Sequence, residues 1–279
     1  MDPYLNTCRE ISRLLTNRYS TSFSLGIRVF PRAFQDAIYS IYGFVRVADE
    51  IVDTFNIPGR EKLFNEFCRE VDKALDQKIS TNPILHAFQS VFHEYGLDRS
   101  WVEAFLRSME MDLAQKTFSR QDFEAYVYGS AEVIGLMCLK VFCGSDEALF
   151  SRLMAPARDL GAAFQKVNFL RDMKADWDLR GRIYMPDIPS LEKIDEACKN
   201  RMQGEIKEDL ASALKGIRAL PAVAKLPVYS VFLYYEGLFQ KIQERPVHDL
   251  LARRLRVADA RKLLLLLKAV WQVKILRTC

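Results

Sequence analysis

The sequence is poor in the residues that interrupt helices. Its 279 residues include only 12 Gly and 10 Pro, and no stretch alternates apolar and polar side chains as a half-buried strand would. Apolar residues instead recur at the spacing of one helix face along nearly the whole chain. The composition therefore argues against many short strands and predicts long helices.

Cysteine, histidine and net charge are also limited. The six Cys form no Cys-x-x-Cys pair and mostly lie in apolar helical surroundings, which is typical of reduced core thiols in a cytoplasmic protein. The three His are scattered and give no support to a zinc site. A net charge of +4 falls short of the concentrated basic excess of nucleic-acid-binding proteins. We therefore expect no nucleic-acid partner.

Long apolar runs and targeting signals are absent as well. No uninterrupted apolar run approaches the roughly 20 residues of a membrane span. The N-terminus has acidic and polar residues where a signal peptide needs a basic stretch and then an apolar run. The nearest apolar stretch, Leu263–Trp271, is short and has basic residues on both sides. We expect a cytoplasmic protein.

Helical periodicity covers most of the chain, without a flexible linker or an internal repeat. It predicts a single all-α domain over residues 1–279. Residues 20–31 are interpreted as a polar connection, and breaks are expected at residues 80–83, 95–98, 143–146, 180–190 and 224–227. The predicted helices are Tyr4–Tyr19, Arg32–Phe55, Glu61–Asp76, Pro83–Tyr95, Arg99–Lys116, Arg120–Phe142, Asp146–Asp176, Ile206–Leu220, Val228–Gln243 and Val257–Arg277.

Two polar stripes stand out on otherwise apolar helices. In the first, Tyr42, Arg46, Asp49 and Asp53 share one face, although an ordinary amphipathic helix with a solvated polar face explains this stripe equally well. Glu50, beside it, suits that simpler interpretation.

The second stripe is harder to explain by solvation. Gln165, Asn168, Asp172 and Asp176 share a face bordered by small and apolar residues. We expect this row to line a cavity.

Both stripes contain Asp-x-x-x-Asp in the same register, which suggests that they face each other. Four carboxylates in one cleft repel one another unless cations lie between them. Ligands that are all oxygen favour a hard divalent ion such as Mg²⁺, with Mn²⁺ as an alternative. A di-iron bundle needs Glu-x-x-His, which neither stripe contains.

Basic and aromatic residues complete the pattern. Arg46, Arg171, Arg180 and Arg182 lie on or near the stripes, and Arg is suited to bidentate capture of phosphate. The 18 Phe and 11 Tyr supply an apolar tunnel. The small residues between 129 and 135 either admit a long chain beside a helix backbone or allow close helix packing. The combination indicates a diphosphate substrate with an apolar tail.

Four motifs in order along the chain resemble those of the squalene/phytoene synthase family of head-to-head prenyl transferases. Ser20–Phe23 is similar to the serine-rich motif, Ala37–Asp53 and Leu160–Pro186 to the two aspartate-rich motifs, and Ala125–Met137 to the helix that contains Tyr and Gly. The likeness covers nearly the whole chain and is greatest to bacterial carotenoid enzymes of the phytoene synthase kind. Lys174 and Ala175 depart from it, since many members carry an acidic residue just before the last Asp.

The resemblance implies an isoprenoid-synthase-like helical bundle around a central apolar cavity. The expected metal ligands are Asp49, Asp53, Asn168, Asp172 and Asp176. The four aspartates, Tyr42 and Tyr126 are the expected catalytic residues, with both tyrosines lining the cavity. The expected substrate-binding residues are Ser20, Ser22, Phe23, Arg46, Gln165, Asn168, Arg171, Tyr235, Arg254 and Arg256.

The implied reaction joins two allylic diphosphates, with geranylgeranyl diphosphate preferred, through a cyclopropyl diphosphate to phytoene. No NADPH is expected for that product. Squalene, dehydrosqualene and hydroxysqualene synthases, which act on farnesyl diphosphate, share the motifs and remain alternatives. A non-catalytic assembly protein of the same fold is a further alternative, although such relatives have lost the aspartates that this chain keeps.

The C-terminal region is basic and contains the leucine run Leu263–Leu267. Between residues 240 and 279 there are ten Lys or Arg and three Asp or Glu. This pattern predicts reversible peripheral contact with the anionic cytoplasmic leaflet, although a closing core helix with solvated charges fits the same residues. A monomer is favoured.

Overall fold

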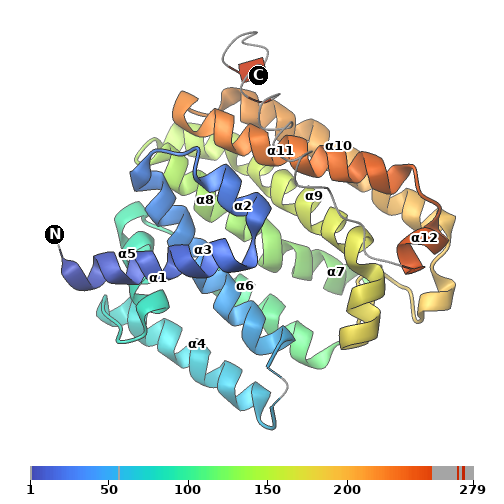
Figure 1. The fold of residues 1–279 in the computed structure, drawn as a ribbon, viewed down its shortest axis with the longest axis horizontal. Helices are drawn as coiled ribbons and strands as arrows, with labels where there is room; N and C mark the ends of the chain where they lie inside the picture. The colour runs from blue at the N-terminus through green and yellow to red at the C-terminus, as the bar shows by residue number, and fades with distance from the viewer. Residues whose placement is uncertain (1, 56, 253–268, 270–271, 274–279) are drawn as a thin grey trace.

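The described part of the chain is mostly helical, as predicted. The computed structural model describes residues 2–55, 57–252, 269 and 272–273, and these residues contain no β-strand, only an isolated bridge between Thr117 and Ile183. The helices are α1 Pro3–Tyr19, α2 Thr21–Ile27, α3 Arg32–Asp53, α4 Arg60–Gln77, α5 Pro83–Tyr95, α6 Arg99–Ala114, α7 Arg120–Val127, η1 Tyr128–Glu132, α8 Val133–Cys143, α9 Glu147–Arg180, η2 Leu191–Lys193, α10 Glu196–Ala219, α11 Ala222–Gln243 and α12 Val247–Ala252 (Figure 1).

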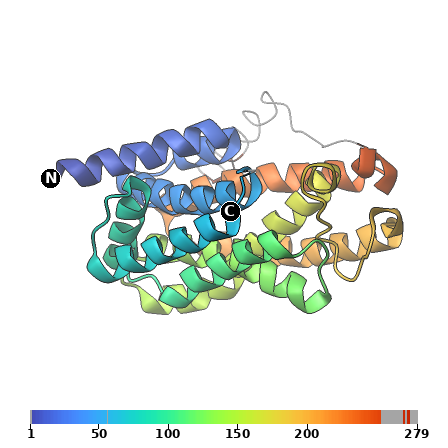
Figure 2. The ribbon, with the colours of Figure 1, turned by 90° about the horizontal axis from the view of Figure 1, so that it is seen from below.

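Helix α3 lies inside the bundle. It packs against α1 on one side and against α6 and α8 on the other, and Figure 2 shows this order of layers. The Phe44 ring of α3 stacks on Phe88 of α5 with 4.1 Å between centroids and meets Phe105 of α6 edge-on. Burial of these rings fixes α3 in the core, so that its polar stripe must also face protein.

Helix α9 is the longest element, with 34 residues. Asp146 caps its N-terminus by accepting a hydrogen bond from the Leu149 N–H. Its C-terminus is set by Gly181, whose φ of +65° suits glycine and turns the chain into the loop that follows. The helix therefore continues one turn beyond Asp176, the predicted end, and carries Arg180 at its last position.

Close backbone contacts join α6, η1, α8 and α9. A methyl group at Gly161 of α9 would lie 2.5 Å from the carbonyl oxygen of Ala131, and one at Gly129 would lie 2.3 Å from that of Ala104. The π-helical turn η1 contains both Gly129 and Ala131. Small residues in this region thus allow close packing, one of the two explanations open from the sequence.

Two predicted breaks are helical instead. Residues 21–27, expected in a connection, form α2, which packs against α11, where a methyl at Gly26 would meet Val231. Helix α11 runs through the expected break at residues 224–227, because Pro227 lies only in its second turn and removes a single hydrogen bond there. Helix α10 also starts ten residues earlier than predicted, and α12 was not predicted.

One described helical run passes a length and composition test for a membrane span. This run is Arg120–Cys143, and 56% of its most apolar 18-residue stretch is buried inside the protein. The search for an uninterrupted apolar run did not find this segment, because polar residues such as Lys140 interrupt it. Core helices of other proteins share this combination of apolar composition and burial.

The predicted helix Val257–Arg277 lies almost wholly outside the described residues.

The five described Cys are free thiols, as expected of reduced cysteines, and they are Cys8, Cys68, Cys138, Cys143 and Cys198.

Candidate active site

A cavity of about 600 Å³ lies among α2, α3, η1, α8, α9, α10 and α11. Along α3, its wall changes from Ile38 and Ile41 to the polar side chains of Tyr42 and Arg46. Helix α9 shows the same gradient, since its lining residues change from apolar at Leu153 to polar from Gln165 onward. The further apolar lining includes Ile27, Phe30, Ile134, Leu139, Phe142, Leu160, Ile217 and Val231.

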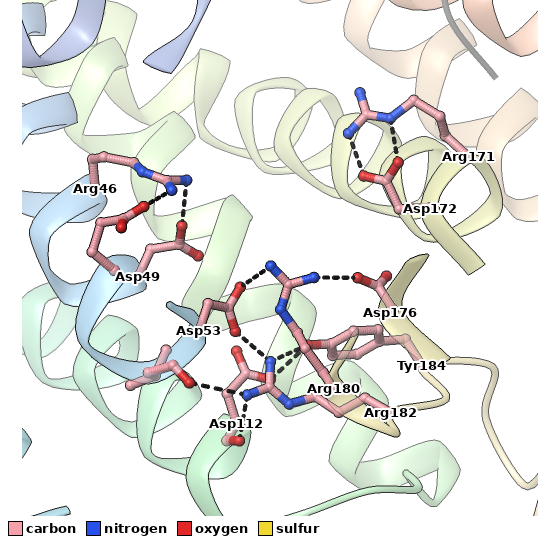
Figure 3. Close-up of polar contacts among 12 residues, drawn as sticks. Arg46, Asp49, Asp53, Asp112, Arg171, Asp172, Asp176, Arg180, Arg182 and Tyr184 are labelled. Carbon is pink, nitrogen blue, oxygen red and sulfur yellow. Dashed lines mark hydrogen bonds and ion pairs between the residues drawn. The ribbon is translucent and has the colours of Figure 1, made fainter. Parts of the chain in front are cut away.

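The two aspartate pairs lie just beyond the polar end of these stripes. Asp49 and Asp53 follow Arg46 on α3, and Asp172 and Asp176 follow Asn168 on α9. The Arg180 guanidinium joins the two helices, with one nitrogen 3.1 Å from Asp53 Oδ2 and another 3.0 Å from Asp176 Oδ1 (Figure 3). The two stripes therefore face each other, as their shared register suggested.

Two further arginines hold the other aspartate of each pair. Arg46 Nη1 lies 2.5 Å from Asp49 Oδ2, and its second nitrogen pairs with Glu50. Arg171 pairs in a bidentate manner with Asp172, with an Nε–Oδ1 distance of 2.8 Å. In Figure 3 these pairs lie on either side of Arg180. Each of the four predicted aspartates thus carries an arginine partner.

A buried network of ion pairs and hydrogen bonds adjoins this cluster. Arg182 Nη1 lies 2.5 Å from Asp53 Oδ1 and 3.4 Å from Asp112 Oδ1, and its other terminal nitrogen donates to the main-chain oxygens of Val52 and Asp112. The Asp112 carboxylate also accepts hydrogen bonds from the Tyr184 hydroxyl at 2.6 Å and the Tyr126 hydroxyl at 2.7 Å. Asp112 thereby fastens the loop after α9 to α6 and orients Asp53.

The polar end of the cavity carries aromatic and amide groups. Tyr42 lines it and hydrogen-bonds to the Ser20 side chain. Tyr235 stacks on Phe164 with 3.9 Å between ring centroids and hydrogen-bonds to Asn168. These side chains form the boundary between the apolar chamber and the charged cluster.

Burial and mutual repulsion make two of the four carboxyl groups of the aspartate pairs weak acids. The pKa of Asp49 rises to about 6, first because of burial and then because of the charge on Asp53. Burial and the charge on Asp172 raise the pKa of Asp176 to about 7. A cation placed here would lower both pKa values and release protons.

The donor set fits a hard divalent metal ion. The carboxylates are oxygen ligands, and Asn168 Oδ1 is a buried oxygen without a hydrogen-bond partner in the described part of the chain. Among the described residues, no three His, Cys, Asp or Glu side chains are gathered closely enough to enclose one ion. A metal would therefore share one or two carboxylates with other oxygens, as Mg²⁺ does when it binds with substrate phosphates.

Several predicted residues lie apart from their expected surroundings. Tyr126 is not among the described residues that line the cavity and lies instead in the network around Asp112. Glu50, expected beside solvent, is buried and pairs with Arg46. The side chains of Ser22 and Phe23, and all of Arg254 and Arg256, lie outside the described part of the structure.

The remaining predicted residues gather at one site. Ser20, Tyr42, Arg46, Gln165, Asn168, Arg171 and Tyr235 all line the cavity.

Sequence reasoning missed three residues of the site, namely Asp112, Tyr184 and Tyr19. Asp112 shares the buried face of α6 with Phe105 and Met109, and a lone acid on such a face was an available signal. The Tyr19 ring, which lines the cavity, lies under the Arg46 guanidinium at 4.3 Å. Tyr184 carried no signal, because its partner comes from a helix about 70 residues away.

Known proteins with similar sequences match most of the chain. It is 28% identical over 284 residues to 15-cis-phytoene synthase from Synechocystis sp., covering 92% of this chain and 82% of that protein. It is 33% identical over 170 residues to presqualene diphosphate synthase from Sinorhizobium fredii, covering 60% of this chain and 58% of that protein.

Solved structures agree in fold. A dehydrosqualene synthase crystal structure with a bound ligand superposes with a TM-score of 0.84 at 21% identity, covering 98% of this chain and 99% of the other. The squalene synthase of Alicyclobacillus acidocaldarius gives a TM-score of 0.76 at 20% identity, covering 88% of this chain and 96% of the other. The sequence profile of squalene/phytoene synthases matches residues 16–188, which contain both aspartate pairs and Arg182. The chain belongs to the squalene/phytoene synthase family.

Proposed function

We propose that this chain condenses two molecules of geranylgeranyl diphosphate head to head to form phytoene. Members of its family are prenyltransferases, and the chain is an enzyme of that class. The observation that carries the proposal is the position of the two facing aspartate pairs at the polar end of an apolar cavity. Such a site suits a substrate with a charged diphosphate and a long hydrocarbon tail.

The charged residues would bind the diphosphates. Mg²⁺, or Mn²⁺ in its place, would be held by Asp49, Asp53, Asn168, Asp172 and Asp176, and when bound it neutralises the departing diphosphate. Arg46, Arg171 and Arg180 offer guanidinium groups that can pair with phosphate oxygens. Ser20 and Tyr42 lie at the border where the first carbon of the prenyl chain would meet the cavity.

The chemistry is carbocation chemistry. The allylic C–O bond breaks, and its electron pair leaves with the diphosphate. The resulting cation adds to the double bond of the second substrate, and loss of a proton gives a cyclopropyl diphosphate. A second ionisation and rearrangement join the two C1 carbons, and loss of a further proton gives phytoene.

The cavity protects such cations from water. Its apolar wall offers no nucleophile over most of its surface, and Phe164 and Tyr235 present aromatic faces near the polar end. Exclusion of water prevents capture of the cation as an alcohol. Aromatic faces also attract positive charge.

The choice of substrate rests on sequence similarity. The similarity to the Synechocystis phytoene synthase extends over 92% of the chain and supports geranylgeranyl diphosphate. The second candidate is condensation of farnesyl diphosphate to a squalene-type product. It is favoured by the 33% identity to a presqualene diphosphate synthase over 60% of the chain.

The test is product analysis with purified protein. Geranylgeranyl or farnesyl diphosphate is incubated with Mg²⁺, with and without NADPH, and the extracted lipids are identified by mass spectrometry. We expect phytoene from geranylgeranyl diphosphate without NADPH. A product formed only from farnesyl diphosphate, or only with NADPH, would replace the phytoene assignment with the second candidate, and no product from either would refute both.

Other properties belong to the same proposal. Residues 1–279 act as one domain, since the cavity wall combines residues from α2 to α11. We expect a cytoplasmic monomer without a nucleic-acid partner, in reversible contact with the anionic membrane face. The basic segment that motivates this contact lies largely outside the described residues.

A further inference from the structure

Arg180 occupies the centre of the charged cluster. It is the last residue of α9, and its guanidinium bridges Asp176 of its own helix and Asp53 of α3, at 3.0 and 3.1 Å (Figure 3). Its side chain is only 26% exposed. Among the described residues, this group carries the direct ion-pair link between the two aspartate stripes, at the point where both substrates' diphosphates would have to lie.

Arg180 is held less firmly than the other buried arginine that reaches Asp53. Arg182 also pairs with Asp112 and donates to the Tyr184 hydroxyl and to two main-chain oxygens, so five protein groups fix it in place. Arg180 contacts the two aspartates, and its Nε is buried without a hydrogen-bond partner among the described residues. Gly181, with a φ of +65°, follows at once and can adopt backbone conformations closed to other residues.

The surrounding charges explain why a cation is needed at this place. Asp53 and Asp176 extend from facing helices, and without a positive group between them the carboxylates would repel each other. A metal ion held by these carboxylates would supply the same compensation. Arg180 and the metal would then compete for the same oxygens, while the incoming diphosphate would offer Arg180 new ones.

We propose that Arg180 is an exchangeable counter-ion of the active site. Before substrate binds, it neutralises Asp53 and Asp176 and holds α3 and α9 together. When divalent metal and diphosphate enter, its fork of N–H donors transfers from the carboxylates to phosphate oxygens. This role rests on the proposed function, and it makes Arg180 a positioning residue that couples metal binding to the presence of diphosphate.

The test measures metal binding without turnover. Binding of Mn²⁺ to the full-length protein is titrated by electron paramagnetic resonance, in the absence and presence of inorganic pyrophosphate. The variants are Arg180→Gln and, as a matched control, Arg99→Gln. Arg99, the first residue of α6, likewise contacts two aspartates, at 3.4 Å from Asp72 and 2.8 Å from Asp76, but both of these lie exposed on α4.

The proposal predicts effects of opposite sign in the two conditions. Without pyrophosphate, Arg180→Gln should bind Mn²⁺ about tenfold more tightly than the wild type, because a competing positive charge is gone. With pyrophosphate it should bind about tenfold more weakly, because a charge-assisted contact to phosphate is lost. Arg99→Gln should match the wild type throughout, and Arg180→Lys should keep the competition but recover little of the phosphate contact.

For Arg180→Gln, any result without this reversal contradicts the proposal. An arginine that only ties two helices together would leave Mn²⁺ binding unchanged, or change it in the same direction in both conditions. Circular dichroism of each variant shows that the comparison is made on folded protein. If Arg180→Gln does not fold, Arg180→Lys tests the phosphate contact alone, because it should weaken Mn²⁺ binding only when pyrophosphate is present. If the wild type binds no Mn²⁺ even with pyrophosphate, the proposed function fails, and this inference fails with it.

Discussion

At the scale of single residues, the aspartates should matter for catalysis and not for folding. Asp49→Asn or Asp172→Asn removes a predicted metal ligand, and we expect the rate of product formation to fall at least about a hundredfold. The melting temperature without metal should stay equal or rise slightly for Asp49→Asn, because Asn removes a charge from a repulsive cluster. The rate is measured by product analysis and the melting temperature by thermal unfolding, on the same preparation of each variant.

A matched control comes from the same helix as Asp172. Asp178 is exposed and pairs with Lys174, so Asp178→Asn should keep nearly full activity. Glu50, which the sequence offered as a control, is buried against Arg46. We still expect Glu50→Gln to be milder than Asp49→Asn, because Arg46 keeps its pair with Asp49. Equal losses in Asp49→Asn and Asp178→Asn would contradict the assignment.

The raised pKa values predict an unusual dependence of stability on pH. Asp49 and Asp176 have pKa values of about 6 and 7 in the fold, against an ordinary 3.8. The folded protein therefore binds these protons more tightly than the unfolded chain does. Their contribution to stability is complete below about pH 4 and is lost as the pH rises through about 6 to 7.

Thermal unfolding in EDTA measures this effect. We expect the melting temperature to fall by about 5 °C between about pH 5.5 and pH 8, and Mg²⁺ to restore much of it at the higher pH. Asp176→Asn should show a shallower fall, because its side chain no longer titrates. An identical slope in the variant and the wild type would refute the pKa assignment.

Prediction of single residues from the sequence succeeded where the spacing alone determines which side chains share a helix face. The face shared by Asp49 and Asp53, and that shared by Asp172 and Asp176, follow from helical geometry. The partners of these residues did not follow, because they depend on which distant segments meet. Asp112 and Tyr184 form their bond across 72 positions of sequence, and nothing in either local pattern indicates the other.

At the scale of helices, glycine positions separate close packing from open space. Gly161 of α9 faces the backbone of Ala131, which cannot move aside as a side chain can. We expect Gly161→Ala to destabilise the fold by about 1–3 kcal/mol, measured by the urea unfolding midpoint.

Gly204 provides the opposite case. It lies in α10, and apart from its chain neighbours and the adjacent backbone of its own helix, no atom of the described residues comes within 4 Å of the position that a methyl group would take there. Gly204→Ala should therefore stabilise the fold by about 0.5–1 kcal/mol. The two variants make the same chemical change in long helices of one protein. If both shifted the midpoint in the same direction, close backbone approach would not be the reason for glycine at position 161.

Most helix positions were predictable, and two of the exceptions have identifiable causes. Helix α2 has polar residues typical of a loop, yet it forms against α11, where Gly26 permits close contact with Val231. Pro227 suggested a break, but its helix starts five residues earlier and loses only one bond. In α2 the packing between helices overrides local preference, which a single sequence does not reveal. In α11 the proline is tolerated because it lies near the start of the helix.

At the scale of the whole molecule, the C-terminal basic region predicts contact with membranes. Residues 240–279 include ten basic and three acidic residues. Each basic residue near an anionic membrane surface should contribute about 1 kcal/mol to the free energy of membrane binding. Co-sedimentation with liposomes measures this. We expect binding to anionic vesicles that high salt weakens, and little binding to neutral ones. Absence of binding to either kind would leave only the closing-helix interpretation.

The central claim is that the facing aspartate pairs hold diphosphate through divalent metal at the mouth of an apolar cavity. Its most direct test is a crystal structure with Mn²⁺ and a thioether analogue of geranylgeranyl diphosphate that cannot ionise. We predict anomalous scattering from Mn²⁺ beside Asp49 or Asp53 and beside Asp172 or Asp176, with the hydrocarbon chain in the cavity lined by Ile41 and Leu160. Metal or diphosphate bound away from these aspartates, with the cavity empty, would contradict the claim.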